Sequence, residues 1–351
     1  MITDSRVFDD EHMPAILEHR DQEVGQLSRA WTPVSSADDV LLYGPSGVGK
    51  TVLTKHTLGR LTKARTTPHA HVETMGQTTG DVLRDLLGQI GGHPVGNETV
   101  EDLTWTVRNH LDEPGICVLD EADDLPGTDT LDALTSIDNL SLVVICHDEQ
   151  RWLGCADPAV QHRFSVEGTE LELRRYHVDE LADILEARAE LGLRDDVWTR
   201  TQLERIADDV AGVARVGIQA LFAAAELATN RGHERIEPED IRDSYDRARH
   251  RIRQENLSSL PYHHHVLYEL IRNAGEMRSA VLHDRYNQLS DSLYQDRAQT
   301  PIGERSRRNK LSKLASYDLV EVVGERANRR YSVVDPGVKS ALDILSVKKQ
   351  N

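Results

Sequence analysis

Eight consecutive residues, GPSGVGKT from Gly44 to Thr51, have the types and the spacing needed to hold the phosphates of a nucleotide. They fit the pattern G-x-x-x-x-G-K-[ST], in which glycines let backbone N–H groups curl around phosphate oxygens. In this pattern Lys50 reaches the β- and γ-phosphates, and the Thr51 hydroxyl ligates Mg²⁺. We therefore predict an ATP or ADP site formed by a continuous segment: Gly44, Pro45, Ser46, Gly47, Val48, Gly49, Lys50, Thr51 and Val52.

Two acids complete the predicted nucleotide chemistry. Asp120 and Glu121 end the apolar run ICVL in the stretch ICVLDEADDL. A strand that ends in two acids and follows a phosphate loop is typical of nucleotide hydrolases. We expect Asp120 to hold through water the Mg²⁺ that Thr51 ligates, and Glu121 to polarise the attacking water.

Three further residues suit the sensing of a phosphate. His147 ends the apolar run LSLVVIC and would contact the γ-phosphate or the attacking water. Arg163 in RFSVEG would be offered in trans to the nucleotide of a neighbouring subunit, and Arg215 in GVARVG would reach the nucleotide from a helical lid.

These residues must be positioned by a sheet and its helices. Strands are predicted within 40–44, 69–74, 116–123 and 140–149, and amphipathic helices at 21–31, 78–92 and 100–113. Alternation of this kind predicts a parallel α/β sheet. From about residue 171 only helical periodicity remains, which predicts a small helical domain. We predict three domains: an ATPase base with a parallel α/β sheet at 1–170, a helical lid at 171–256 and a winged-helix DNA-binding domain at 257–351.

The first lid helix carries a cation on its apolar face. Leu181, Ile184, Leu185 and Arg188 follow the spacing i, i+3, i+4, i+7, so Arg188 lies on the side that the leucines bury. Tyr176, just before this helix, would pack against the base or ribose of the nucleotide.

The C-terminal region reverses the charge of the chain. The protein has a formal net charge of -18, but residues 251–351 hold 17 Lys and Arg against 12 Asp and Glu. We predict a helix that starts at Thr300 and Pro301, followed by two short strands around Gly324 to Asn328, the pattern of a winged helix-turn-helix. The predicted DNA contacts lie on this helix and at the hairpin: Arg305, Arg308, Asn309, Ser312, Arg326, Arg329 and Arg330. The alternative is a charged, solvated helix and hairpin with no partner.

The composition and the remaining residues of interest indicate the environment in which the protein works. The acidic excess and the scarcity of Lys resemble proteins from a salt-loaded, halophilic cytoplasm, where carboxylates keep the surface hydrated. Cys117 and Cys146 lie in apolar runs and are expected to be buried thiols. The triplet His263 to His265 is expected on a helix surface. With no long apolar stretch, the chain is expected to be cytoplasmic, associated with the nucleoid and without membrane contact.

With these parts in place, the chain resembles the archaeal replication initiators, AAA+ ATPases related to the eukaryotic origin-recognition subunits. MPAILEHRDQEV resembles the lead-in of that family, which lies near the adenine and implies His19 and Arg20 as nucleotide contacts. RYHVDELADILEAR and GVARVG resemble its lid motifs and imply Tyr176, Arg188 and Arg215. RFSVEG lies where the family has its finger arginine, Arg163. Where the family usually has Asn-Asp after the sensor strand, this chain has His147-Asp148.

The resemblance implies ATP or ADP with Mg²⁺ as cofactors, and a slow ATPase in which nucleotide acts as a switch. It implies double-stranded origin DNA, the replicative helicase and other initiator copies as partners. Two alternatives stay open: a DNA-binding ATPase that regulates transcription without starting replication, and an ATPase that loads a protein ring without reading DNA sequence. In a salty interior counterion release contributes little, so base contacts would carry the DNA specificity.

Overall fold

The computed structural model describes residues 1–33, 37–64, 67–125, 128–164, 169–297, 299–324 and 328–341. Arg326, one of the predicted DNA contacts, lies outside these ranges. The chain divides into two compact units, Met1–Arg242 and Asp243–Asn351. Within the described ranges, none of the helices combines the length and the apolar character that crossing a membrane requires.

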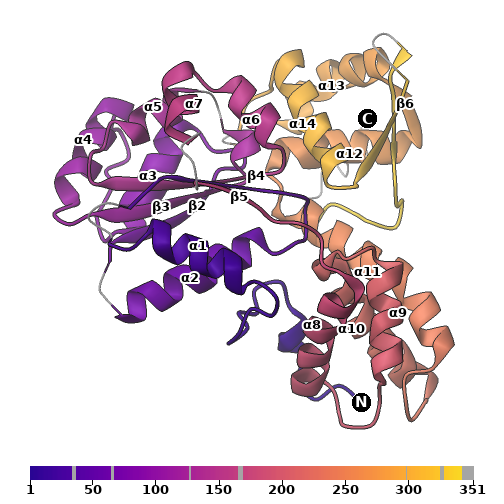
Figure 1. Ribbon diagram of the computed structural model, residues 1–351. Helices are drawn as coiled ribbons and strands as arrows, with labels where there is room; N and C mark the ends of the chain where they lie inside the picture. The colour runs from indigo at the N-terminus through magenta and orange to yellow at the C-terminus, as the bar shows by residue number, and fades with distance from the viewer. Residues whose placement is uncertain are drawn as a thin grey trace. The chain divides into compact units, whose positions relative to one another are not determined.

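The first unit is built on a parallel sheet (Figure 1). Its described strands are β1 (Val40–Tyr43), β2 (His69–Glu73), β3 (Gly115–Asp120), β4 (Leu140–Cys146) and β5 (Glu170–Glu172). They lie in the order β2-β3-β4-β1-β5, and every neighbouring pair is parallel. The predicted parallel α/β sheet is therefore confirmed. The carboxyl ends of β1, β3 and β4 share the edge of the sheet where ligands bind in open α/β folds.

The sequence analysis missed β5, because its only apolar residue is Leu171. This strand is specified by pairing with β1, where Leu41 N–H donates to Thr169 O at 2.9 Å and Leu173 N–H donates to Tyr43 O at 2.8 Å. Hydrogen bonds from a long-range partner, rather than local periodicity, form this edge strand.

Helices cover both faces of the sheet. One face packs against α3 (Thr79–Gln89), α4 (Val100–His110), α5 (Thr128–Thr135), α6 (Glu149–Cys155) and α7 (Pro158–Phe164). The other packs against α1 (Asp21–Ala30) and α2 (Lys50–Ala64). Side chains alternate between the two cores along β3, where Cys117 and Leu119 face α3 to α7 while Ile116 and Val118 face α2. The predicted burial of the Cys117 and Cys146 thiols is confirmed.

The rest of the first unit is helical. It comprises η1 (Ser5–Phe8), η3 (Ala122–Asp124), α8 (Val178–Gly192), α9 (Arg200–Asp209), α10 (Ala214–Arg231) and the start of α11 (Pro238–Ser259). Capping boxes fix several starts, for example Thr199 with Gln202 at α9, where two helix N–H groups gain side-chain acceptors. The predicted domain boundary at residue 256 falls inside α11, which continues to Ser259.

The second unit has the element order of a winged helix. α12 (Tyr262–Ala274), α13 (Ser279–Leu293) and α14 (Glu304–Ser316) accompany a described sheet of β6 (Glu276–Arg278), β8 (Arg330–Val333) and β7 (Val320–Val323). All neighbouring strands in it are antiparallel. The sequence analysis missed β6, which has three residues and is again specified by its partner strand.

Two predictions for this unit are wrong. Helix α14 begins at Glu304 with Gly303 as its N-cap, not at Thr300, since the backbone of Pro301 to Gly303 is irregular. His264 and His265 are each only 3% exposed, so the histidine triplet is not a surface feature. α12 is the central helix of this unit and packs against α13, α14 and β8, which leaves it almost no solvated face.

Candidate functional site

The predicted phosphate loop joins β1 to the first turn of α2. Gly47 and Gly49 have φ of +76° and +94°, the left-handed region that favours glycine, and these turns curl the backbone into a cradle. Lys50 is buried, and its ammonium donates to the carbonyls of Gly44 and Pro45 at 2.7 and 2.8 Å. Burial lowers the pKa of Lys50. The loop therefore holds a desolvated cation inside a glycine-rich turn, which fits the phosphates of a nucleotide.

Thr51 and Asp120 meet as the sequence predicts. Thr51 Oγ1 donates to Asp120 Oδ2 at 2.7 Å, and the backbone N–H of Glu121 donates to Asp120 Oδ1 at 2.9 Å. Burial by itself would raise the pKa of Asp120, but hydrogen bonds from His71, Thr51 and Glu121 hold it below its usual value. A hydroxyl beside an ionised carboxylate is a donor set suited to Mg²⁺, which uses few protein ligands and several oxygens from phosphate and water.

The sequence analysis missed two residues of this site, His71 and Thr74. His71 Nε2 lies 3.0 Å from Asp120 Oδ2. Thr74 is fully buried, and its hydroxyl lies 2.9 Å from Asp120 O and 2.8 Å from Glu121 O. Thr74 thus holds the turn in which Glu121 adopts a left-handed φ of +57°. The sequence signal that could have indicated His71 is the row of polar residues that alternates with apolar ones in HAHVET. This strand, β2, lies beside β3, which carries Asp120.

Arg20 and Tyr176 contact each other beside the phosphate loop. The Arg20 guanidinium carbon lies 4.1 Å from the Tyr176 ring centroid, and Arg20 Nε donates to Tyr176 Oη at 2.9 Å. Arg20 Nη2 also donates to Arg174 O at 2.7 Å. A Cβ added to Gly49 would lie 3.8 Å from Tyr176 Oη, so the tyrosine stands at the phosphate loop.

Arg215 stands at the first turn of α10, directly against the loop. Its backbone N–H donates to Gly47 O at 3.2 Å. A Cβ on Gly47 would lie 2.9 Å from Val213 Cγ1 and 3.3 Å from Arg215 Cβ, so only glycine fits under the lid. The Arg215 guanidinium forms an ion pair with Asp10 at 2.6 Å.

Four other predicted residues make contacts of their own. His147 Nδ1 and its backbone N–H each lie 2.8 Å from Asp123 Oδ2, at the end of β4 beside η3. His19 Nε2 lies 2.7 Å from Asp183 Oδ2 on α8. Neither contact involves the phosphate loop.

Arg163 and Arg188 are also engaged away from the loop. Arg163, on α7, forms an ion pair with Asp39 and donates to Thr135 O at 3.0 Å. Arg188 lies on the buried face of α8, as its spacing predicts, and donates to Val7 O at 2.7 Å. Its burial lowers its pKa. The roles inferred for these residues from the family resemblance stay predictions.

In the second unit, the described part of the predicted DNA surface is exposed. Arg305, Asn309 and Ser312 lie on the solvent side of α14, as does Arg308, which forms an ion pair with Glu304. At the hairpin Arg329 and Arg330 are exposed. Arg330 forms an ion pair with Glu276 at 2.7 Å.

Two cations of the same region face inward instead. Arg307 is 4% exposed, with its guanidinium carbon 4.5 Å from the Tyr286 ring centroid, and it donates to Asn287 Oδ1 at 2.7 Å. Lys313 is buried and lies 4.4 Å from the Tyr317 ring centroid. Arg307 thus fixes α14 against α13, whereas Lys313 contacts the C-cap residue of its own helix. Neither buried cation contributes to an outer basic face.

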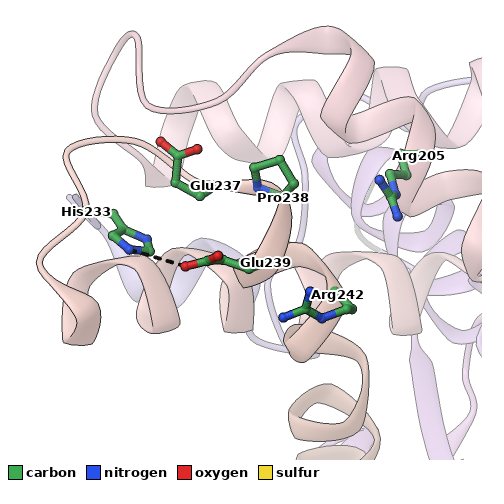
Figure 2. Close-up of a pocket in the computed structure, with 6 residues that line it drawn as sticks. All are labelled: Arg205, His233, Glu237, Pro238, Glu239 and Arg242. Carbon is green, nitrogen blue, oxygen red and sulfur yellow. Dashed lines mark ion pairs between the residues drawn. The ribbon is translucent and has the colours of Figure 1, made fainter.

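Figure 2 shows a pocket on the lid. It lies between α9, the start of α11 and the segment before α11, and it is lined by Arg205, His233, Glu237, Pro238, Glu239 and Arg242. His233 Nε2 and Glu239 Oε1 lie 3.6 Å apart in it. None of the residues predicted to bind nucleotide or DNA lines this pocket.

Comparisons with known proteins agree with this geometry. Residues 35–151 match the model of an AAA domain, and residues 182–246 match the Cdc6 AAA+ ATPase-type lid domain. The solved structure of the Aeropyrum pernix ORC1 protein in complex with DNA has a TM-score of 0.71 and 24% identity, covering 95% of this chain and 93% of that one. Cdc6p from Pyrobaculum aerophilum has a TM-score of 0.63 and 20% identity, with 95% and 94% covered.

Relatives of known sequence extend over nearly the whole chain. ORC1-type DNA replication protein 1 of Halobacterium salinarum is 31% identical over 83% of this chain and 97% of its own length. ORC1-type DNA replication protein 9 of the same organism is 32% identical over 345 residues, which cover 95% of this chain and 94% of the relative. The halophilic character inferred from the acidic, lysine-poor composition agrees with these relatives. The chain belongs to the family of ORC1-type DNA replication proteins, AAA+ ATPases with a Cdc6-type lid.

Proposed function

We propose that this protein is an ATP-dependent DNA replication initiator that recognises origin DNA and helps to recruit the replicative helicase. The observation that carries the proposal is the contact between lid and phosphate loop, where Arg215 N–H donates to Gly47 O and Tyr176 stands beside Gly49. A nucleotide held by the loop would touch residues of both base and lid. Its binding would therefore bias the lid position, which makes nucleotide a switch.

Each residue of the nucleotide site would have a separate role in binding or hydrolysis. Lys50 would leave the carbonyls of Gly44 and Pro45 for phosphate oxygens, and Thr51 and Asp120 would hold Mg²⁺, which neutralises phosphate charge. Glu121 would orient water, and Arg215 would contact phosphate from the lid. Arg163 would act in trans on a neighbouring copy, after exchanging its present ion pair with Asp39 for that phosphate.

The second unit would supply DNA recognition. α14 would enter the major groove, with the exposed side chains of Arg305 and Asn309 at base edges, and the hairpin cations would follow the phosphate backbone. The ORC1 protein of Aeropyrum pernix, a structural neighbour over 95% of this chain, was solved in complex with DNA, which supports this assignment.

The nucleotide site is tested with Lys50→Ala. Equilibrium binding of a fluorescent ADP should be tight for the wild-type protein and at least about tenfold weaker for the variant, since charge-assisted hydrogen bonds to phosphate are lost. Lys55→Ala, one turn further along α2 at an exposed position, is the charge-matched control and should bind normally. Equal affinity for Lys50→Ala and the wild-type protein would refute the site.

DNA recognition is tested by selecting bound fragments from random and genomic DNA, with ATP and with ADP, at low and at molar KCl. An initiator should enrich a discrete repeat that survives high salt and confers replication on a plasmid. A repeat without origin activity would favour a transcriptional regulator. Lack of enrichment at every salt concentration would leave an ATPase that acts on protein.

A further inference from the structure

His71 has no part in the nucleotide motifs, yet its side chain reaches the centre of the site. Its Nε2 lies 3.0 Å from Asp120 Oδ2, and the two side chains are only 14% and 8% exposed. An ionised carboxylate accepts hydrogen bonds and cannot donate them, so the imidazole must carry a hydrogen on Nε2. Asp120 Oδ2 therefore accepts two hydrogen bonds, one from His71 and one from Thr51.

The sheet register explains this meeting of residues that are 49 positions apart. In the parallel pair β2 and β3, His71 is opposite Val118, so Asp120 is two residues further along the same face. That face packs against α2, which carries Thr51, whereas Ala70 and Val72 point into the other core. The alternation of HAHVE thus places His69, His71 and Glu73 on one face of β2. His69 and Glu73 are exposed, whereas His71 is partly buried and its Nε2 reaches Asp120.

We propose that His71 is a positioning residue of the magnesium site, which holds the Asp120 carboxylate in the orientation that also meets the Thr51 hydroxyl. This inference rests on the nucleotide-binding function proposed above. With Glu121 N–H on Oδ1 and His71 on Oδ2, both oxygens are fixed, and the carboxylate cannot rotate about its Cβ–Cγ bond. Partners that orient a metal-site side chain in this way typically change metal affinity 10- to 100-fold when removed.

The test compares ADP affinity with Mg²⁺ and with EDTA, using fluorescent ADP and the full chain. In the wild-type protein Mg²⁺ should strengthen ADP binding. His71→Leu should reduce that strengthening about tenfold while leaving the affinity in EDTA unchanged. His71→Gln, whose amide nitrogen can occupy the place of Nε2, should restore most of it. His69→Ala, two residues earlier on β2 and exposed, should behave as wild type.

The outcomes separate this proposal from the function on which it rests. Lack of ADP binding by the wild-type protein would refute the nucleotide site itself. ADP binding that is strengthened by Mg²⁺ equally in the wild-type protein and His71→Leu would overturn the role of His71 alone. If leucine prevents folding, as seen from thermal unfolding without ligand, His71→Asn replaces it, because the shorter amide cannot reach Asp120.

Discussion

Arg215 Nη2 lies 2.6 Å from Asp10 Oδ2, so the arginine that faces the phosphate loop from the lid already has an anionic partner within the chain. Asp10 belongs to the N-terminal segment that docks on the lid, where Phe8 stacks on Phe222 at 5.0 Å and Thr3 N–H donates to Gly192 O. A phosphate that uses Arg215 must compete with this carboxylate.

We therefore expect Asp10→Asn to tighten ATP binding. The Asp10 and Arg215 side chains are 42% and 25% exposed, and an ion pair of this kind is worth about 0.2–1 kcal/mol. Its removal should improve the dissociation constant about 1.5- to 5-fold. Asp9→Asn, the adjacent exposed carboxylate, is the control for a general change of charge. Equal or weaker ATP binding by Asp10→Asn would show that the pair does not oppose the nucleotide.

Replacing glycine with alanine should lower the stability of the protein in the phosphate loop and raise it inside α2. Gly44 has φ of +143°, and a Cβ there would lie 2.2 Å from Leu173 O, so Gly44→Ala should lower the free energy of unfolding by about 1–3 kcal/mol. Gly59, inside α2, has open space around its Cβ position, so Gly59→Ala should raise it by about 0.5–1 kcal/mol.

Denaturant unfolding followed by tryptophan fluorescence measures both changes in the first unit, since Trp31, Trp105, Trp152 and Trp198 all lie there. Unchanged stability of Gly44→Ala would contradict the close approach of the loop to the segment after β5.

The winged-helix unit should lose stability in mild acid. Burial lowers the pKa of His264 to about 3, with a smaller contribution from the charges of Lys310 and Lys313 on α14. Between pH 6.5 and 3 the unfolded chain binds a proton at this residue and the folded chain does not, so stability falls as the pH falls, by up to about 1.4 kcal/mol per unit.

Hydrogen exchange of α12 amides at pH 7 and pH 5, corrected for intrinsic rates, measures this loss of stability. The pKa values of His263, His265 and His283 are also lowered by burial, so His264→Leu should reduce the pH dependence without abolishing it. An identical pH dependence in this variant would show that His264 is not the main group.

Arg305 is the sharpest test of DNA readout, because it is exposed on α14. Arg305→Ala should relax sequence preference by about 1–3 kcal/mol at one base pair if the side chain reads a base. A uniform loss across all sequences would place Arg305 on phosphate instead. Arg249→Ala, on α11 and outside the winged-helix elements, removes the same charge and should leave preference unchanged. Competition binding with single-base variants of the selected site separates these outcomes.

Features that depend on residues close together in the sequence could be predicted, whereas features that depend on residues far apart in the sequence could not. The phosphate loop, the acids that end β3 and the burial of Arg188 were readable because each is written within a few residues, as a motif or as helical spacing. β5 and β6 were not, since each has only three residues and is formed by hydrogen bonds to a partner strand. The buried histidines of α12 were misjudged because a local pattern cannot tell how many neighbours a helix has.

The sequence by itself determined which residues form the proposed nucleotide site: a contiguous glycine-rich loop and the two acids that follow the apolar run of β3. It also determined the basic character of the C-terminal region. Only the tertiary structure decided which residues surround these groups. His71 meets Asp120 through strand register, Asp10 meets Arg215 through docking of the N-terminal segment on the lid, and Arg307 turns inward onto Tyr286. The physical reason is that a side chain's partner across strands or helices depends on packing of the whole unit, which no local spacing records.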